Sequence, residues 1–153
     1  MTFTFESNNA QGTNPVIKMV AYVPIMRFGE RYFNLEFGDY DMELGMTDYV
    51  VVTDNGDMRK VLKTVATTLE MFLKEFPGEK VHFDGSDPRR HAYYQKLIRD
   101  YYQFIVPLFD VKGYVDGGLE TFKTGVDYDF IAVNKRNTKL ESHEKQETKA
   151  HTR

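Results

Sequence analysis

Apolar and polar residues alternate over several short segments, which is the pattern of a β-strand with one buried face. The clearest case is residues 31–37, where Phe33, Leu35 and Phe37 share one face of the strand. Residues 48–53 (DYVVVT) instead form a continuous β-branched run, which is typical of a central strand. The patterns together predict strands at residues 2–6, 16–23 (ending near Pro24), 31–37, 48–53, 80–83, 109–115 and 128–133, with a short element at 120–123 after a Gly117-Gly118 turn.

Two longer segments carry apolar residues at the spacing of a helix. The first is predicted to begin after Asp57 as N-cap and to end at residue 76, before Pro77-Gly78. The second is predicted to begin at Pro88 and to end near Pro107. The apolar stripes are Val61, Leu62, Val65, Leu69, Phe72, Leu73 and Phe76 in the first helix, and Tyr94, Leu97, Ile98, Tyr101 and Ile105 in the second.

The order of these elements predicts an α/β (α+β) fold, β-β-β-β-α-β-α-β-β, with two main helices on a single mixed, mainly antiparallel sheet. We expect a right-handed parallel crossover where residues 48–53, the first helix and residues 80–83 meet. Residues 1–136 are predicted to form one globular domain. Residues 137–153 are polar apart from Leu140 and Ala150 and are predicted to form a disordered tail.

Composition narrows the possible functions. The chain has 153 residues and no cysteine, which excludes a disulfide framework, a zinc-thiolate site and a cysteine nucleophile. A formal net charge of −3 gives no general attraction to nucleic acid. No signal peptide is recognisable, and no apolar segment approaches the roughly 20 residues needed to span a bilayer. We therefore expect a cytoplasmic protein without membrane contact.

Residues 81–100 predict a strand, a tight turn and a helix that opens with unusual charges. Arg89 and Arg90 fall in the first helical turn, where the helix dipole disfavours cations. Arg90 and Tyr94, four residues apart, share one helix face. One interpretation is an anion or partner site, formed with the free amides of residues 86–89. The alternative is that Arg90 pairs with an acidic side chain and that Tyr94 belongs to the core.

The loop before the first helix, residues 54–57, is the second candidate region. Its carboxylates either cap the helix or receive a basic partner. We expect this loop to face the turn before the second helix. The candidate binding residues are thus Asp54, Asn55, Gly56, Asp57, Gly85, Ser86, Asp87, Arg90 and Tyr94.

No metal site is predicted. Asp39, Asp41 and Glu43 resemble the start of a calcium loop, but the positions that need Gly and Glu hold Leu44 and Val50. A solvated acidic turn is the simpler interpretation. The histidines lack metal-ligand spacing, and His91 is expected at the surface of the second helix; the four are His82, His91, His143 and His151.

Four segments resemble those of a family of uncharacterised bacterial proteins of about this length. They are YFNLEFGDYD (32–41), VVTDNGDMRKVLKTVATTL (51–69), GSDPRRHAYY (85–94) and YDFIAV (128–133). That family shows a Gly-Ser-Thr-Pro turn, two spaced arginines and a Leu-Tyr pair. Gly85, Ser86, Pro88, Arg90 and Tyr94 match this pattern, while Asp87, Ala92 and Tyr93 depart from it. The resemblance implies kinship and no particular chemistry.

The element order is also similar to the core of GNAT acetyltransferases. That resemblance implies an acyl transfer from acetyl-coenzyme A, with Tyr94 as the acid that protonates the leaving thiolate. GNAT enzymes hold the pyrophosphate on a glycine-rich loop before a helix. Here that loop has one glycine, Gly56, between Asp54 and Asp57, whose charges would repel a diphosphate.

Two hypotheses follow. The first is a non-catalytic module without a cofactor that binds a small anionic ligand or a protein partner. The second is a GNAT-like acyltransferase with an altered coenzyme A site.

Overall fold

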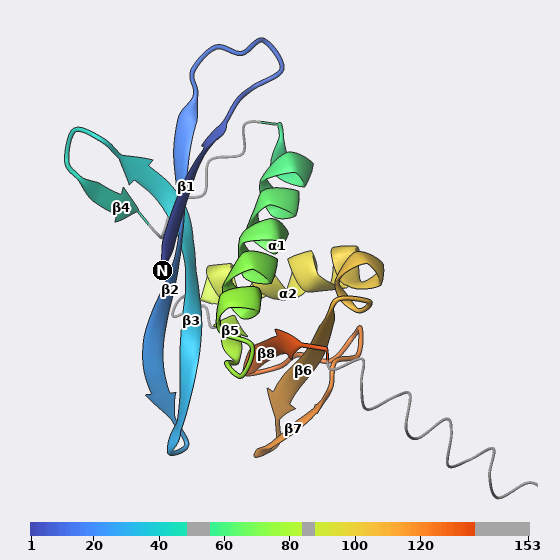
Figure 1. The fold of residues 1–153 in the computed structure, drawn as a ribbon. Coiled ribbons are helices and arrows are strands. Elements are labelled where there is room, and N and C mark those ends of the chain that lie inside the picture. Colours follow the sequence, from blue (N-terminus) through green and yellow to red (C-terminus); the bar gives the residue numbers. More distant parts are fainter. Residues whose placement is uncertain (49–55, 84–87, 137–153) are drawn as a thin grey trace, which may run out of the picture.

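The structure, a computed structural model, describes residues 1–48, 56–83 and 88–136, with only the backbone for Met58, Arg89, Arg90 and Tyr93. Its elements follow the predicted order of strands and helices (Figure 1). They are β1 (Thr2–Ser7), β2 (Val16–Arg27), β3 (Glu30–Asp41), β4 (Met46–Asp48), α1 (Met58–Glu75), β5 (Val81–Phe83), α2 (Pro88–Ile105), β6 (Phe109–Val115), β7 (Gly118–Thr121) and β8 (Phe130–Lys135).

The strands form one mixed sheet in the order β1-β2-β3-β5-β8-β6-β7, with β4 paired to β3. All pairs among these strands are antiparallel except β3 and β5, which are joined through α1. The predicted fold class is confirmed. The parallel pairing is short, since only Phe33 and Asn34 of β3 match Val81 and His82 of β5. Beyond these residues the two halves of the sheet are free to diverge.

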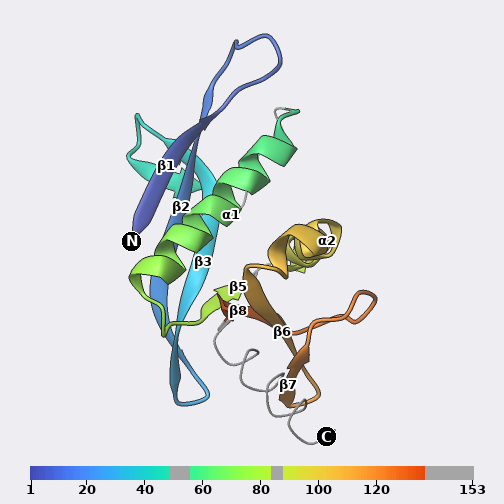
Figure 2. The same ribbon diagram turned by 45° about the vertical axis from the view of Figure 1, so that its right-hand side comes forward.

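One face of the sheet carries the main core. α1 lies along β2 and β3, whereas α2 lies nearer to β5, β6 and β8 (Figure 2). The apolar stripe of α1 is buried as predicted up to Leu73, and Phe76 at its end is partly exposed. Phe72 stacks on Tyr22 of β2 at a ring-centroid distance of 4.2 Å. Burying a side chain of this size stabilises the fold by about 1.5–3 kcal/mol, so this stripe fixes where α1 lies.

A smaller aromatic cluster occupies the other face of the sheet. His82 is fully buried, with ring centroids 4.8 Å from Tyr32 and 3.9 Å from Phe130. Phe28, in the turn between β2 and β3, stacks on Tyr114 of β6 at 5.0 Å. The hairpin tip therefore contacts the distant half of the sheet and holds the two halves together.

Several strand predictions differ from the structure, three of them at β2, β4 and β7. Strand β2 continues past Pro24 to Arg27, because β1 begins opposite Ala21 and leaves this part of β2 as an edge, where proline is tolerated. β4 covers only the first residue of the predicted strand 48–53, and the rest of that strand lies outside the described residues. Residues 137–153 lie outside them as well.

The third difference concerns the turn before β7, which is Asp116-Gly117 and not Gly117-Gly118. Val115 pairs with Gly118, so the loop has two residues, and both have positive φ angles of 51° and 81°. An Asp-Gly pair with this geometry is the favoured two-residue hairpin turn. Gly118 is thereby released to begin β7.

Candidate functional site

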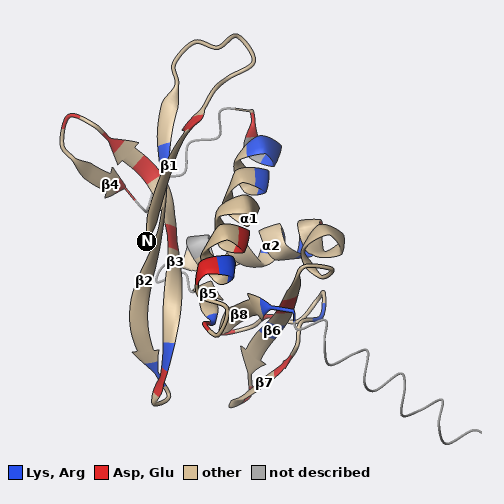
Figure 3. Cartoon of the chain, in the orientation of Figure 1, with Lys and Arg blue, Asp and Glu red and all other residues tan. Residues whose placement is uncertain are grey.

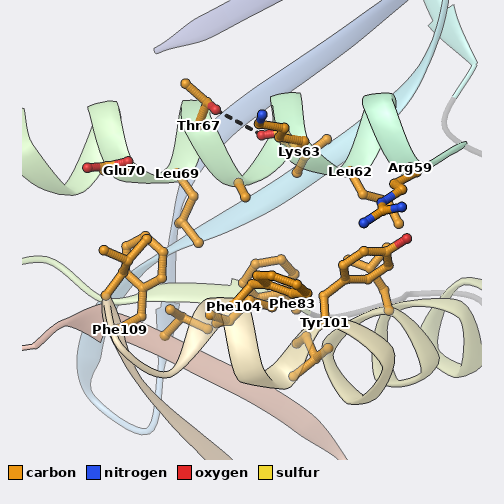
Figure 4. Close-up of a pocket in the computed structure, with 17 residues that line it drawn as sticks. Arg59, Leu62, Lys63, Thr67, Leu69, Glu70, Phe83, Tyr101, Phe104 and Phe109 are labelled. Atoms are coloured by element: carbon orange, nitrogen blue, oxygen red, sulfur yellow. Dashed lines mark hydrogen bonds between the residues drawn. The ribbon is translucent and has the colours of Figure 1, made fainter. Parts of the chain in front are cut away.

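A pocket of about 610 Å³ lies between α1 and α2 on the helix-covered face of the sheet (Figure 4). Its walls are mainly apolar side chains of the two helices, and its floor comes from β5, β6 and β8. The helical lining is Arg59, Leu62, Lys63, Val65, Ala66, Thr67, Leu69 and Glu70 of α1 with Leu97, Ile98, Tyr101, Phe104 and Ile105 of α2. Leu108, Phe83, Phe109 and Val133 complete it.

The pocket exists because the two helices follow different halves of the sheet. β3 and β5 pair over only two residues each, so α1 on one half and α2 on the other do not close over every apolar residue between them. At the mouth, Phe104 and Leu108 are 69% and 48% exposed. Apolar side chains of this size in contact with water mark a surface suited to a ligand or partner.

The charged side chains of the pocket lie at its rim. Arg59 and Tyr101 lie at one end, with the guanidinium group and the phenol hydroxyl directed toward each other (Figure 4). Lys63 is one turn further along α1, and Glu70 is at the opposite end. The side chains of Arg59 and Lys63 make no hydrogen bond or ion pair with any residue that the structure describes.

Basic residues gather on the first turns of α1 (Figure 3). The first turn of this helix holds no acidic residue to offset Arg59 and Lys60, and the carboxylate of Asp57 just before it accepts hydrogen bonds from Ser7 and Asn8. Cations at this end of a helix lie in the unfavourable part of its dipole, at a cost of about 0.3–1 kcal/mol each. The pocket end near Arg59 is therefore electropositive and suited to a negatively charged group.

Asp57 has a different role from the predicted helix cap. It occupies the N-cap position, but its side chain makes no capping hydrogen bond. Its carboxylate accepts hydrogen bonds from the Ser7 hydroxyl (2.8 Å) and the Asn8 amide (2.9 Å). Asp57 thus ties the start of α1 to the end of β1. Gly56 precedes it with a φ angle of 78°, a conformation that glycine adopts without strain.

At the start of α2, the described part of the predicted site is the backbone of Arg90, together with Tyr94. Asp54, Asn55 and Gly85 to Asp87 lie outside the described residues. Tyr94 is 3% exposed, and its ring packs edge-on against Phe83 at 5.8 Å. The interpretation of Tyr94 as a core residue is confirmed. Of the predicted binding residues that the structure describes, Gly56, Asp57 and Tyr94, none lines the pocket.

The structure corrects the placement of His91. This residue is half-buried, and its Nε2 forms a hydrogen bond with the carbonyl oxygen of Tyr128. Gln95, one turn later, donates to the same carbonyl at 2.9 Å and to the Asp127 carboxylate at 2.8 Å. This polar face of α2 is therefore bound to the segment before β8 and remains partly exposed.

The acidic residues predicted to form a solvated turn have protein partners, and Asp39 and Asp41 lie at the end of β3, which continues to Asp41. Asp39 forms an ion pair with Lys18, whose side chain is fully buried. Asp41 accepts the backbone amides of Glu43 and Leu44 at 2.8 and 3.0 Å, which closes the turn. Among the described residues, no group of three or more His, Asp or Glu side chains is placed to hold a metal ion. No helix in the described part of the chain has the length and apolarity needed to cross a bilayer.

Comparison with known proteins identifies the family. A family model described as "Family of unknown function (DUF6934)" matches residues 1–136. The chain belongs to this family. No curated protein and no solved structure matches it. The matched span of DUF6934 includes every helix and strand from β1 to β8, so the pocket lies entirely within the family's domain.

Sequence reasoning missed the polar end of the pocket in this DUF6934 chain. The available signal was the spacing of Arg59 and Lys63, two cations four residues apart at the start of an amphipathic helix. Tyr101 was expected inside, on the apolar stripe of the second helix. That Arg59 and Tyr101 meet depends on how the two helices are placed on the sheet.

Proposed function

We propose that this DUF6934 chain is a non-catalytic binding module and that the pocket between α1 and α2 is its ligand site. The observation that carries the proposal is the pocket itself, about 610 Å³ with an apolar lining and polar groups only at its rim. Ligand sites in proteins have this size and this division between apolar walls and a few placed polar groups.

The apolar lining gives a ligand its binding free energy. Leu97, Tyr101 and Ile105 lie on the buried stripe of α2 yet keep partial contact with solvent at the pocket. Each Å² of apolar surface removed from water is worth about 25 cal/mol. A ligand that covers these side chains gains the free energy of removing their remaining apolar surface from water.

The proposal keeps the small anionic ligand expected from the sequence and moves its site. The predicted loops precede the helices, whereas the pocket begins with Arg59, two residues after Asp57. The other kind of ligand expected from the sequence is a protein partner, which would cover Phe104 and Leu108. The proposal places the module in the cytoplasm, which the lack of a membrane-crossing helix in the described residues supports.

Filling the pocket tests the proposal. N-phenyl-1-naphthylamine, a neutral apolar dye, is expected to bind the chain and to become strongly fluorescent. Ala66→Phe places a ring in the pocket and should abolish this signal. Ala92→Phe makes the same change at an exposed position of α2 away from the pocket and should preserve it. Equal fluorescence from both variants, with both folded by circular dichroism, would refute the pocket as the binding site.

A GNAT-like acyltransferase with acetyl-coenzyme A is the second candidate. One observation favours it: parallel strands β3 and β5 are connected through α1 and are followed by α2 and a further antiparallel pair, β6 and β8. The burial of Tyr94 weakens it, because a core phenol is poorly placed to protonate a leaving group. An NMR titration with millimolar acetyl-coenzyme A should shift amides at the starts of both helices if this candidate is correct.

A further inference from the structure

We infer that the ligand of this pocket is an unbranched alkyl chain ending in a small anionic head group, a carboxylate or a phosphate monoester, with the head at Arg59. The inference rests on the proposed function and specifies its ligand class. Three features of the pocket carry it: the charge difference between its ends, its continuous apolar wall, and the scarcity of hydrogen-bonding groups along that wall.

The two ends of the pocket carry opposite charge. Arg59 and Lys63 lie at one end and Glu70 at the other, eleven residues after Arg59 on the same helix (Figure 4). At 1.5 Å per residue these ends are about 16 Å apart along the helix. A negatively charged head is attracted to the Arg59 end and repelled from the Glu70 end, which fixes the direction of the chain.

The Arg59 end also offers the right donors. A guanidinium group presents paired N–H donors that match two oxygens of a carboxylate or a phosphate. The Tyr101 hydroxyl, directed toward Arg59, supplies a further donor. Neither cation at this end is engaged by another side chain within the described residues.

Between its ends, the pocket is suited to a chain without polar groups. Leu62, Val65 and Leu69 of α1 face Leu97, Ile98 and Ile105 of α2 across it. The one hydroxyl on the α1 side, Thr67, already donates to the Lys63 carbonyl at 2.8 Å. A peptide would bring an amide and a carbonyl for every residue, and each would lose its water without gaining a partner. An alkyl chain has no such cost.

The experiment compares four ten-carbon compounds by isothermal titration calorimetry, each below its micelle-forming concentration. They are decanoate, decyl phosphate, decanol and decyltrimethylammonium. We expect one or both anions to bind at least tenfold more tightly than decanol, since a hydrogen bond to a charged group contributes about that factor or more. The cation should bind more weakly than decanol. Comparing the two anions decides between a carboxylate and a phosphate.

Matched variants locate the head group. Arg59→Gln should remove most of the advantage of the anion over decanol. Lys60→Gln removes a neighbouring charge that does not line the pocket, and the anion should keep its advantage in this variant. In wild type, lengthening the chain from octanoate to decanoate adds two methylenes and should strengthen binding about 16-fold, because each buried methylene contributes about fourfold.

The outcomes separate this inference from the proposed function. If decanol and decanoate bind with equal affinity and Ala66→Phe abolishes the binding of both, the pocket binds apolar ligands. The inference of an anionic head group is then refuted. If neither these compounds nor the neutral dye binds, both proposals fall. A third outcome is that the chain binds no amphiphile and forms a dimer, which Phe104→Ser and Leu108→Ser dissociate. In that case a second copy of the chain covers the pocket, and the inference is overturned.

Discussion

The ring of Tyr128 lies directly over the backbone of Gly113, in the space that a side chain at position 113 would need. A Cβ atom built on Gly113 would overlap three atoms of that ring. Tyr128 is 1% exposed, and its hydroxyl donates to the Glu120 carboxylate at 2.8 Å and accepts the Lys123 amide at 3.0 Å. Two hydrogen bonds therefore fix the hydroxyl end of the ring, and only glycine fits beneath it.

Gly113→Ala is accordingly expected to destabilise the fold. Overpacking of a buried site costs about 1–3 kcal/mol, and the fixed ring places this site in the upper part of that range. Urea denaturation measures the change in free energy of unfolding. Gly118→Ala is the control, because a Cβ at that position meets no atom within 4 Å. Equal stability of the two variants would contradict the contact.

Lys18 and Asp39 give a second stability prediction. Lys18 is fully buried on the helix-covered face of the sheet and forms an ion pair with Asp39 across the β2–β3 register. Lys18→Met should cost about 3 kcal/mol, because it removes the ammonium group that forms an ion pair with a largely buried carboxylate. The double variant Lys18→Met/Asp39→Leu should recover much of that loss. A single variant as stable as the wild type would show that Asp39 relies on other groups.

The helices and most strands could be predicted from the sequence because their signals are local. The stripe from Val61 to Leu73 recurs at helical spacing, and six of the seven core positions predicted for α1 are buried, Phe76 at the end of the helix being exposed. The alternation through Phe33, Leu35 and Phe37 likewise places those side chains toward the helices and Tyr32 on the other face. Each of these predictions needs information from only a few neighbouring residues.

The candidate site could not be predicted in the same way because it depends on distant parts of the chain. The partners of Asp57 are Ser7 and Asn8, about fifty residues earlier, so its carboxylate was assigned to the wrong hydrogen bonds. The pocket depends on how far β3 and β5 stay paired, which no local pattern encodes. Arg59 and Tyr101 become neighbours only through that divergence.

Glu120 makes the stability of the fold sensitive to acid. The hydrogen bond from Tyr128 and then that from Lys123 lower the pKa of the Glu120 carboxyl below its usual value near 4.5. A group with a lowered pKa in the folded state contributes stability above its unfolded pKa and loses it as the pH falls through the folded pKa. The loss should therefore begin as the pH drops below about 4.5.

Glu120→Gln should make stability depend less steeply on pH in this range, because Gln keeps an acceptor for Tyr128 but does not titrate. Urea denaturation at pH 6 and pH 3 measures the difference between variant and wild type. Glu6→Gln, at an exposed position of β1, is the control and should leave the slope unchanged. If stability depends equally steeply on pH in Glu120→Gln and Glu6→Gln, Glu120 is not the acid-sensitive group.

At alkaline pH, Tyr22 is the residue expected to limit stability. Burial raises the pKa of its phenol well above its ordinary value of 10. The Thr68 hydroxyl donates to the Val65 carbonyl at 2.8 Å, so in the 3.0 Å contact between the two side chains Tyr22 donates to Thr68. Ionisation would place a charge in the core and remove this donor. A raised folded pKa gives stability that is present below pH 10 and is lost as the pH rises above it.

Tyr22→Phe should therefore cost about 1 kcal/mol at pH 7, the value of one hydrogen bond, and should reduce the decline in stability between pH 10 and pH 12. Some decline should remain, because burial also raises the pKa of Tyr32 and Tyr128. Tyr114→Phe is the control: this ring stacks on Phe130, and its hydroxyl makes no hydrogen bond within the described residues. If Tyr114→Phe flattened the alkaline decline as much as Tyr22→Phe, the decline would come from the tyrosines in general and not from the buried phenol beside Thr68.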